Sequence, residues 1–152
     1  MKRLMLLAAV LCACGPREDA ATDTAGMTAA AAGPAALTAA DLAGTWSGVD
    51  MAEGSDSVLA RFTVISPTGM DAKAVFEGST DTVQVTHMID ADSVVATSAP
   101  YPHPTLRGKP QVTFRAVGRM QGGKLVGTSQ EMLVSKPDSV VSRTRFELTK
   151  TG

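Results

Sequence analysis

From Asp41 onwards the chain alternates apolar and polar residues in short runs that turn residues interrupt. A period of two is the pattern of β-strands with one buried face. The alternation predicts eight strands, at about 42–50, 57–66, 70–77, 82–89, 93–100, 111–120, 124–134 and 140–149. All but one of the gaps are short enough for hairpin turns, the last of them at Lys136-Pro137-Asp138. The sequence therefore predicts an all-β domain of consecutive antiparallel hairpins.

The alternation also assigns the faces of these strands. Trp46, Phe62, Phe76, Phe114 and Phe146 all fall on apolar faces. No helical segment is available to cover those faces, so we expect the sheet to close into an eight-stranded antiparallel up-and-down barrel. A two-sheet sandwich or a half-closed barrel is the alternative. Small residues at inward positions predict spare room inside the barrel: Ala60, Ala72, Ala74, Ala96, Ala116, Gly118 and Gly127.

The first residues have the pattern of a signal peptide. Lys2 and Arg3 precede an apolar run, Leu4–Leu11, that is too short to cross a hydrocarbon core of about 30 Å. The run ends in Leu11-Cys12-Ala13-Cys14, which resembles the bacterial lipobox. The resemblance implies cleavage before Cys14 and attachment of diacylglycerol and a further fatty-acid chain, such as palmitate, to that cysteine. The alternative is an ordinary secretory signal that leaves Cys14 as a thiol.

This resemblance also implies a location and a division of the chain. Gly15, rather than Asp, follows the lipidated cysteine, which for this class of lipoprotein implies the outer membrane of the cell envelope, facing the periplasm. Residues 1–13 are then the signal peptide. Residues 14–40 are the lipidated Cys14 and a flexible tether rich in Ala, Thr, Gly and Pro, and residues 41–152 are the barrel domain. The partner at Cys14 would be membrane lipid.

A second resemblance lies at the start of the first predicted strand. Gly44-Thr45-Trp46 is similar to the Gly-x-Trp signature of the calycins, the superfamily of lipocalins and avidins. There the tryptophan plugs the closed end of the barrel and a basic residue of the last strand packs across its ring, a role for which Arg143 and Arg145 are the candidates. The Thr-Asp-Tyr motif of many lipocalins and the polar biotin shell of avidins are absent. The resemblance therefore implies a fold and a generic capacity for ligands.

Candidate ligand contacts come from one long loop and two strands. Residues 99–110 contain four prolines, and Tyr101, His103 and Leu106 give this segment a surface suited to covering a barrel mouth, although a rigid surface crossover would look the same. His87 shares the parity of its apolar neighbours, which fits either a ligand contact or an ordinary interior histidine. Glu131 is either a surface residue or a ligand contact at the mouth.

Charge is distributed unevenly along the predicted barrel. Residues 41–98 carry nine acids and two basic residues, whereas residues 99–152 carry three acids and nine basic residues. One flank is thus expected to be acidic and the other basic, with Arg115, Arg119, Arg143 and Arg145 at outward positions. A basic flank suits anionic headgroups or an acidic partner protein, or is simply a solvated wall.

Several classes of function are disfavoured. The net charge of -1 does not match a uniformly basic nucleic-acid-binding surface. There is no G-x-S-x-G turn and no cysteine after Cys14, and two histidines do not make a metal site by themselves, so we expect no enzyme, cofactor or metal. The favoured function is binding of a small apolar molecule or envelope component. The alternative is a structural or interaction lipoprotein with a filled barrel, working through its charged wall and proline-rich loop. A third and least favoured alternative is an isomerase or hydrolase that uses lumen residues such as His87, Ser129 and Glu131. A cavity of about 300 Å³ or more would favour the first, and a filled core the second.

Overall fold

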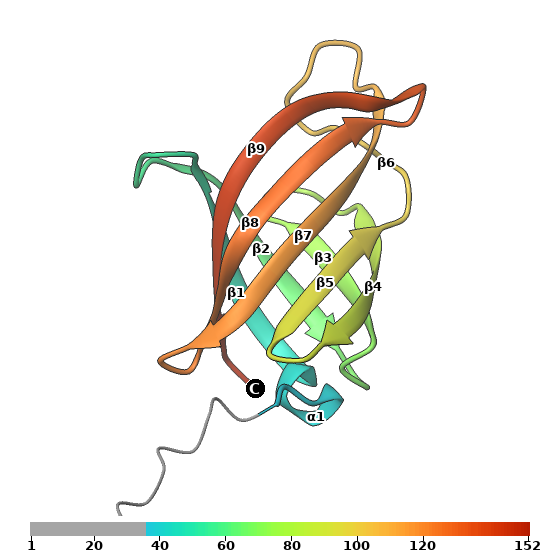
Figure 1. The fold of residues 1–152 in the computed structure, drawn as a ribbon. Helices are drawn as coiled ribbons and strands as arrows, with labels where there is room; N and C mark the ends of the chain where they lie inside the picture. The colour runs from blue at the N-terminus through green and yellow to red at the C-terminus, as the bar shows by residue number, and fades with distance from the viewer. Residues whose placement is uncertain (1–35) are drawn as a thin grey trace, which may run out of the picture. The chain divides into compact units, whose positions relative to one another are not determined.

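The computed structural model describes residues 36–152, which form a closed antiparallel β-barrel (Figure 1). The predicted signal peptide, Cys14 and the tether as far as residue 35 lie outside the described residues. The elements are α1 (Ala39–Leu42), β1 (Gly44–Ala52), β2 (Val58–Ser66), β3 (Asp71–Phe76), β4 (Thr82–Asp90), β5 (Ser93–Ser98), β6 (Tyr101–Pro102), β7 (Gln111–Gln121), β8 (Lys124–Leu133) and β9 (Lys136–Lys150).

The strands pair in the order β5-β4-β3-β2-β1-β9-β8-β7, and β5 pairs with β7 to close the ring. The predicted eight-stranded up-and-down barrel is therefore confirmed, and a two-sheet sandwich is excluded. The short β6 is an additional strand, which pairs with the start of β7 through Tyr101 and Val112. Because its two residues belong to the long proline-rich segment, this pairing fixes where that segment begins to cross the end of the barrel.

Two boundaries differ from the sequence-based expectation. The chain forms α1 where a tether and the start of a strand were predicted, because Thr38 and Asp41 make a reciprocal capping box at its N-terminus. Leu37, just before this box, is already buried in the core. At the other end of the domain β9 begins at Lys136, and the turn expected at Lys136-Pro137-Asp138 is instead at 134–135.

One end of the barrel is closed by α1 and Trp46. The indole of Trp46 is 3% exposed and donates a hydrogen bond from Nε1 to the carbonyl oxygen of Leu42, at 3.0 Å. The helix packs so closely on the turn between β2 and β3 that a Cβ at Gly69, whose φ is +82°, would lie 1.8 Å from the Ala39 carbonyl oxygen. Only glycine fits this approach.

The cation over Trp46 is a lysine rather than the predicted arginine. Lys150 Nζ lies 5.4 Å from the centre of the ring, because Lys150 is the residue of β9 that pairs with Trp46 across the seam between β1 and β9. Arg145 is aligned with Met51, farther along the same seam, and binds Asp56 at 2.9 Å. Arg143 lies beyond the aligned part of β1. The predicted plug of Trp46 with Arg143 or Arg145 is therefore corrected to Trp46 with Lys150.

The inward glycines do not leave the spare room that the sequence predicts. A Cβ at Gly48 would meet the ring of Phe62 at 2.6 Å, and Cβ atoms at Gly118 and Gly127 would meet the ring of Phe146 at 2.8 and 2.7 Å. Each phenylalanine ring therefore occupies the space above a glycine on a neighbouring strand. Small residues and large rings are complementary here, so the interior is much fuller than a count of small residues implies.

Candidate functional site

The barrel interior contains a cavity of about 110 Å³ that is partly open to solvent. This is below the roughly 300 Å³ that would favour a binding site for an ordinary small molecule, so that criterion of size is not met. The core is not filled either, because the cavity exceeds the space of a single water, about 30 Å³. An apolar cavity of about 150 Å³ holds benzene, so this one suits a ligand of that size or smaller. Most of the lining is apolar; its polar or ionisable side chains are those of Trp46, Asp50, His87, Tyr101, Ser129, Glu131 and Thr144.

Four aromatic rings form a continuous row along the cavity wall. Phe62 contacts Phe76 with ring centres 5.9 Å apart, Phe76 stacks on Tyr101 at 6.1 Å, and Tyr101 meets the edge of Phe114 at 6.3 Å. All four residues line the cavity. These spacings are in the range of favourable aromatic pairs, so the row is a stable wall of the cavity.

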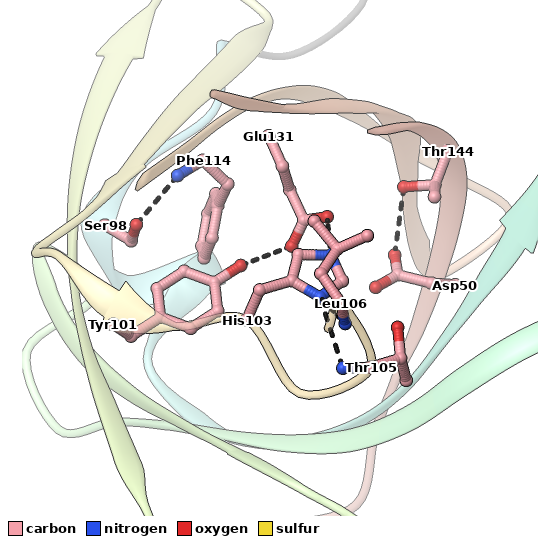
Figure 2. Close-up of polar contacts among 9 residues, drawn as sticks. All are labelled: Asp50, Ser98, Tyr101, His103, Thr105, Leu106, Phe114, Glu131 and Thr144. Atoms are coloured by element: carbon pink, nitrogen blue, oxygen red, sulfur yellow. Dashed lines mark hydrogen bonds and ion pairs between the residues drawn. The ribbon is translucent and has the colours of Figure 1, made fainter. Parts of the chain in front are cut away.

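Glu131 lies at the end of the barrel opposite α1 and faces inwards. Figure 2 shows its carboxylate between the Tyr101 hydroxyl, which donates to Oε1, and the His103 ring, whose Nε2 lies 3.1 Å from Oε2. Leu125, Gly127 and Ser129 precede it at alternating positions of β8, so the parity of the strand directs Glu131 into the lumen. The structure thus places Glu131 in the lumen and the surface position is wrong, while contact of Glu131 with a ligand stays a prediction.

His103 links the long loop to the wall through a defined tautomer. Its Nδ1 accepts hydrogen bonds from the backbone N–H groups of Thr105 and Leu106, at 3.2 and 3.1 Å. Because backbone N–H groups only donate, Nδ1 must be the unprotonated nitrogen, and the ring proton sits on Nε2. Nε2–H therefore donates to Glu131, and both ring nitrogens are already engaged.

Asp50 is the second carboxyl group of the cavity. It is the next inward residue of β1 after Trp46 and Gly48, and Thr144 Oγ1 lies 3.5 Å from its Oδ1, a long hydrogen bond. Burial, assisted by the charge of Glu131, raises the pKa of Asp50 to about 7, against the smaller opposing effect of the Thr144 hydroxyl. The two carboxyl groups are thus close enough to influence each other.

The Tyr101 phenol stays protonated. Burial, followed by the charge of Glu131 and the hydrogen bond to it, raises the pKa of Tyr101 well above its usual value. A protonated phenol is a donor, which is what the Glu131 carboxylate requires. Tyr101 and His103 therefore both bind this carboxylate as neutral donors, and neither supplies a positive charge.

The predicted contact residues separate into three groups. Tyr101, Glu131 and His87 line the cavity. His87 belongs to the end near α1, where Nδ1 lies 2.9 Å from the Gly69 carbonyl oxygen, so it is a hydrogen-bonded interior histidine. His103 is buried against Glu131 without lining the cavity, and Leu106 is 37% exposed on the loop.

Sequence reasoning missed Asp50 and Thr144. The signal was available, because Asp50 has the parity of Trp46 and Thr144 has the parity of Phe146. An acid at the end of a strand, next to a turn, resembles the other turn acids of this half of the chain. Its inward direction becomes evident only when the strand is known to continue as far as Ala52.

The outer wall carries the expected basic residues. Arg115, Gln130 and Arg143 are directly aligned across β7, β8 and β9, and all three are exposed. Other basic residues of this wall are paired: Arg119 with Asp92 at 3.7 Å, and Lys124 with Glu147 at 2.6 Å. Among residues 36–152, Arg115 and Arg143 have no ion-pair partner.

No protein-family model, curated protein or solved structure matches this chain. Within residues 36–152 no helix is long and apolar enough to cross a bilayer. The same part of the chain holds no group of three or more His, Cys, Asp or Glu residues arranged to bind a metal ion. The closed barrel is compatible with a calycin-like fold, and further functional argument rests on the cavity and the outer wall.

Proposed function

We propose that this protein is a lipid-anchored lipoprotein of the bacterial cell envelope whose barrel binds a small, largely apolar molecule. The observation that carries the binding proposal is the cavity inside the barrel, with its aromatic and aliphatic walls and its carboxyl groups gathered at one end. Convergent polar groups in an otherwise apolar cavity are typical of sites that orient a ligand. The volume restricts the ligand to a few non-hydrogen atoms.

Binding is favoured over catalysis by the way in which the titratable groups are used. His87 lies toward the α1 end of the barrel and the carboxyl groups lie toward the other end, so they do not form an acid–base pair. Both nitrogens of His103 are engaged in hydrogen bonds within the protein. A general base needs a free position within reach of a substrate proton.

Native mass spectrometry of the full chain carrying Cys14→Ser tests the binding proposal. The protein is incubated with an extract of the bacterial envelope, and Ala96→Leu in the same background serves as a control that fills the cavity. A reproducible added mass that is present in the parent and absent from the control is the expected result. A clean mass for both proteins would overturn the proposal.

The anchor has its own test. Wild-type protein should fractionate with membranes and carry the added mass of its acyl chains, because each buried methylene contributes about 0.8 kcal/mol of membrane affinity. Cys14→Ser should lose this mass and appear in the soluble fraction. Retention of the Cys14→Ser protein in the membrane fraction would show that Cys14 is not the anchor.

A second candidate function is supported by the aligned pair Arg115 and Arg143. Two unpaired arginines in one row offer a site for an anionic headgroup or an acidic protein, each worth about 1 kcal/mol near an anionic surface. Charge reversal of both residues to Glu should abolish low-salt binding to vesicles that contain anionic lipid. Arg61→Glu, an exposed change on the other flank, is the matched control, and equal binding by all variants would exclude this surface.

A further inference from the structure

We infer that the cavity accepts a compact ligand that combines an apolar body with a protonated amine. This inference rests on the proposed binding function and adds the chemical class of the ligand. It is drawn from three features of the lumen: uncompensated carboxyl groups, hydrogen-bond donors that are already used, and a row of aromatic faces.

The first feature is the charge of the lining. Asp50 and Glu131 are the acids of the cavity, and no lysine or arginine of residues 36–152 lines it. Both oxygens of Glu131 accept hydrogen bonds, as a carboxylate does, but the donors are a neutral phenol and a neutral imidazole. A carboxylate in an apolar site without a counter-charge is costly. A cationic ligand would supply the missing charge, whereas an anionic ligand would be repelled.

The second feature is the shortage of donors for other ligand types. The Tyr101 hydroxyl and His103 Nε2–H are both directed at Glu131. His87 Nδ1 is engaged with the Gly69 carbonyl oxygen, and Trp46 Nε1 with the Leu42 carbonyl oxygen. A ligand that mainly accepts hydrogen bonds therefore finds few partners here, while a ligand that donates finds the two carboxyl groups.

The third feature is the aromatic row of Phe62, Phe76, Tyr101 and Phe114. Tyr101 is both a member of this row and the donor to Glu131, so the rings extend to the carboxyl end of the cavity. Aromatic faces attract cations, most strongly where water is excluded. An ammonium group beside Glu131 and Asp50 would thus contact oxygens of the two carboxyl groups and also the aromatic rings. The hydrocarbon part of the ligand would occupy the apolar rest of the cavity.

Three probes of equal length distinguish the ligand classes: n-butylamine, n-butanol and butyrate. Trp46 is the single tryptophan of the chain and lines the cavity, so its fluorescence reports occupancy. Titrations use the full chain carrying Cys14→Ser, at pH 8, where n-butylamine is protonated. The expected result is binding of the amine at least tenfold tighter than binding of the alcohol, and no binding of butyrate.

Two variants locate the effect. Asp50→Asn should lower the affinity for n-butylamine about tenfold and leave the affinity for n-butanol unchanged. Asp81→Asn, in the turn between β3 and β4 at the same end of the barrel but outside the cavity, should change neither. Equal binding of amine and alcohol, or binding of butyrate, would overturn the amine assignment while leaving cavity binding intact. Failure of all three probes to bind would instead overturn the proposed function, and this inference with it.

Discussion

The buried carboxyl of Asp50 makes stability depend on pH in a direction opposite to that of most acids. An ordinary paired carboxylate stabilises the fold when it is ionised. The pKa of Asp50 is instead raised from 3.8 to about 7, by its burial and by the charge of Glu131, so this group stabilises the fold when it is protonated. The folded state therefore binds more protons than the unfolded state between these two values. Stability contributed by this group is highest below pH 3.8 and is lost as the pH rises to about 7.

The size of the effect follows from the difference between the two pKa values. A difference of roughly three pKa units corresponds to about 4 kcal/mol, of which roughly 3 kcal/mol falls between pH 5 and pH 9. Asp50→Asn replaces the carboxyl by a neutral group of the same shape. The variant should therefore gain roughly 3 kcal/mol over the parent between pH 5 and pH 9, or about 10 °C in Tm for a domain of this size.

Urea unfolding, followed by the fluorescence of the buried Trp46, measures this difference at pH 5, 7 and 9. The other titratable groups around Asp50 are Glu131, Tyr101 and His103, and they are present in both proteins, so the difference between parent and variant isolates Asp50. Asp81→Asn is the exposed control and should follow the parent at every pH. A constant difference between parent and Asp50→Asn from pH 5 to pH 9 would refute the reasoning.

Three further changes test the contacts of the barrel by urea unfolding. Tyr101→Phe removes one donor to the Glu131 carboxylate and should cost about 1–3 kcal/mol; no loss would show that water replaces the hydroxyl. Gly127→Ala places a Cβ 2.0 Å from the carbonyl oxygen of Val117 on the neighbouring strand β7 and should cost about 1–3 kcal/mol or more; a neutral result would contradict the close packing. Lys150→Met removes the cation over Trp46 and should cost about 0.5–1 kcal/mol, and an unchanged midpoint would mean that the contact is not stabilising.

The strands were predictable because the alternation is a local property. One face of each strand is buried, so Ala72 and Ala74 alternate with exposed Asp71 and Lys73, and Ala116 alternates with exposed Arg115. Closure of the barrel follows from eight apolar faces without a helix to cover them. The short α1 was missed because its capping box occupies an alanine-rich stretch that resembles the tether before it.

The site was less predictable because it depends on pairings across the barrel. Tyr101 and Glu131 are thirty residues apart, and nothing in the alternation indicates that the loop containing Tyr101 and His103 folds back onto β8. The cation over Trp46 shows the same limit. Arg143 and Arg145 are plausible candidates from the sequence, but the register of β9 against β1 selects Lys150.

The space inside the barrel could not be inferred from residue sizes alone. From the sequence, Gly118 and Gly127 are expected to leave empty space inside the barrel, yet both lie under the ring of Phe146 from β9. Which ring covers which glycine depends on register and strand tilt, and neither is encoded locally. The cavity is consequently about 110 Å³ rather than the larger space that the small residues suggest.

The seam between β1 and β9 brings the two ends of the folded domain together. Thr45 donates its N–H to the Gly152 carbonyl oxygen at 2.9 Å and accepts from the N–H of Thr151 at 2.8 Å. The other pairings within residues 36–152 join strands that are near neighbours in the chain. The β1–β9 pairing closes the longest loop and therefore has the largest entropic cost of loop closure. We therefore expect the pairing of β1 with β9 to form later and more slowly than the hairpins. Because the two ends of the domain are adjacent, they could be joined and the chain opened at another turn without changing the strand pairings. Domains with this property tolerate circular permutation and insertion into another protein.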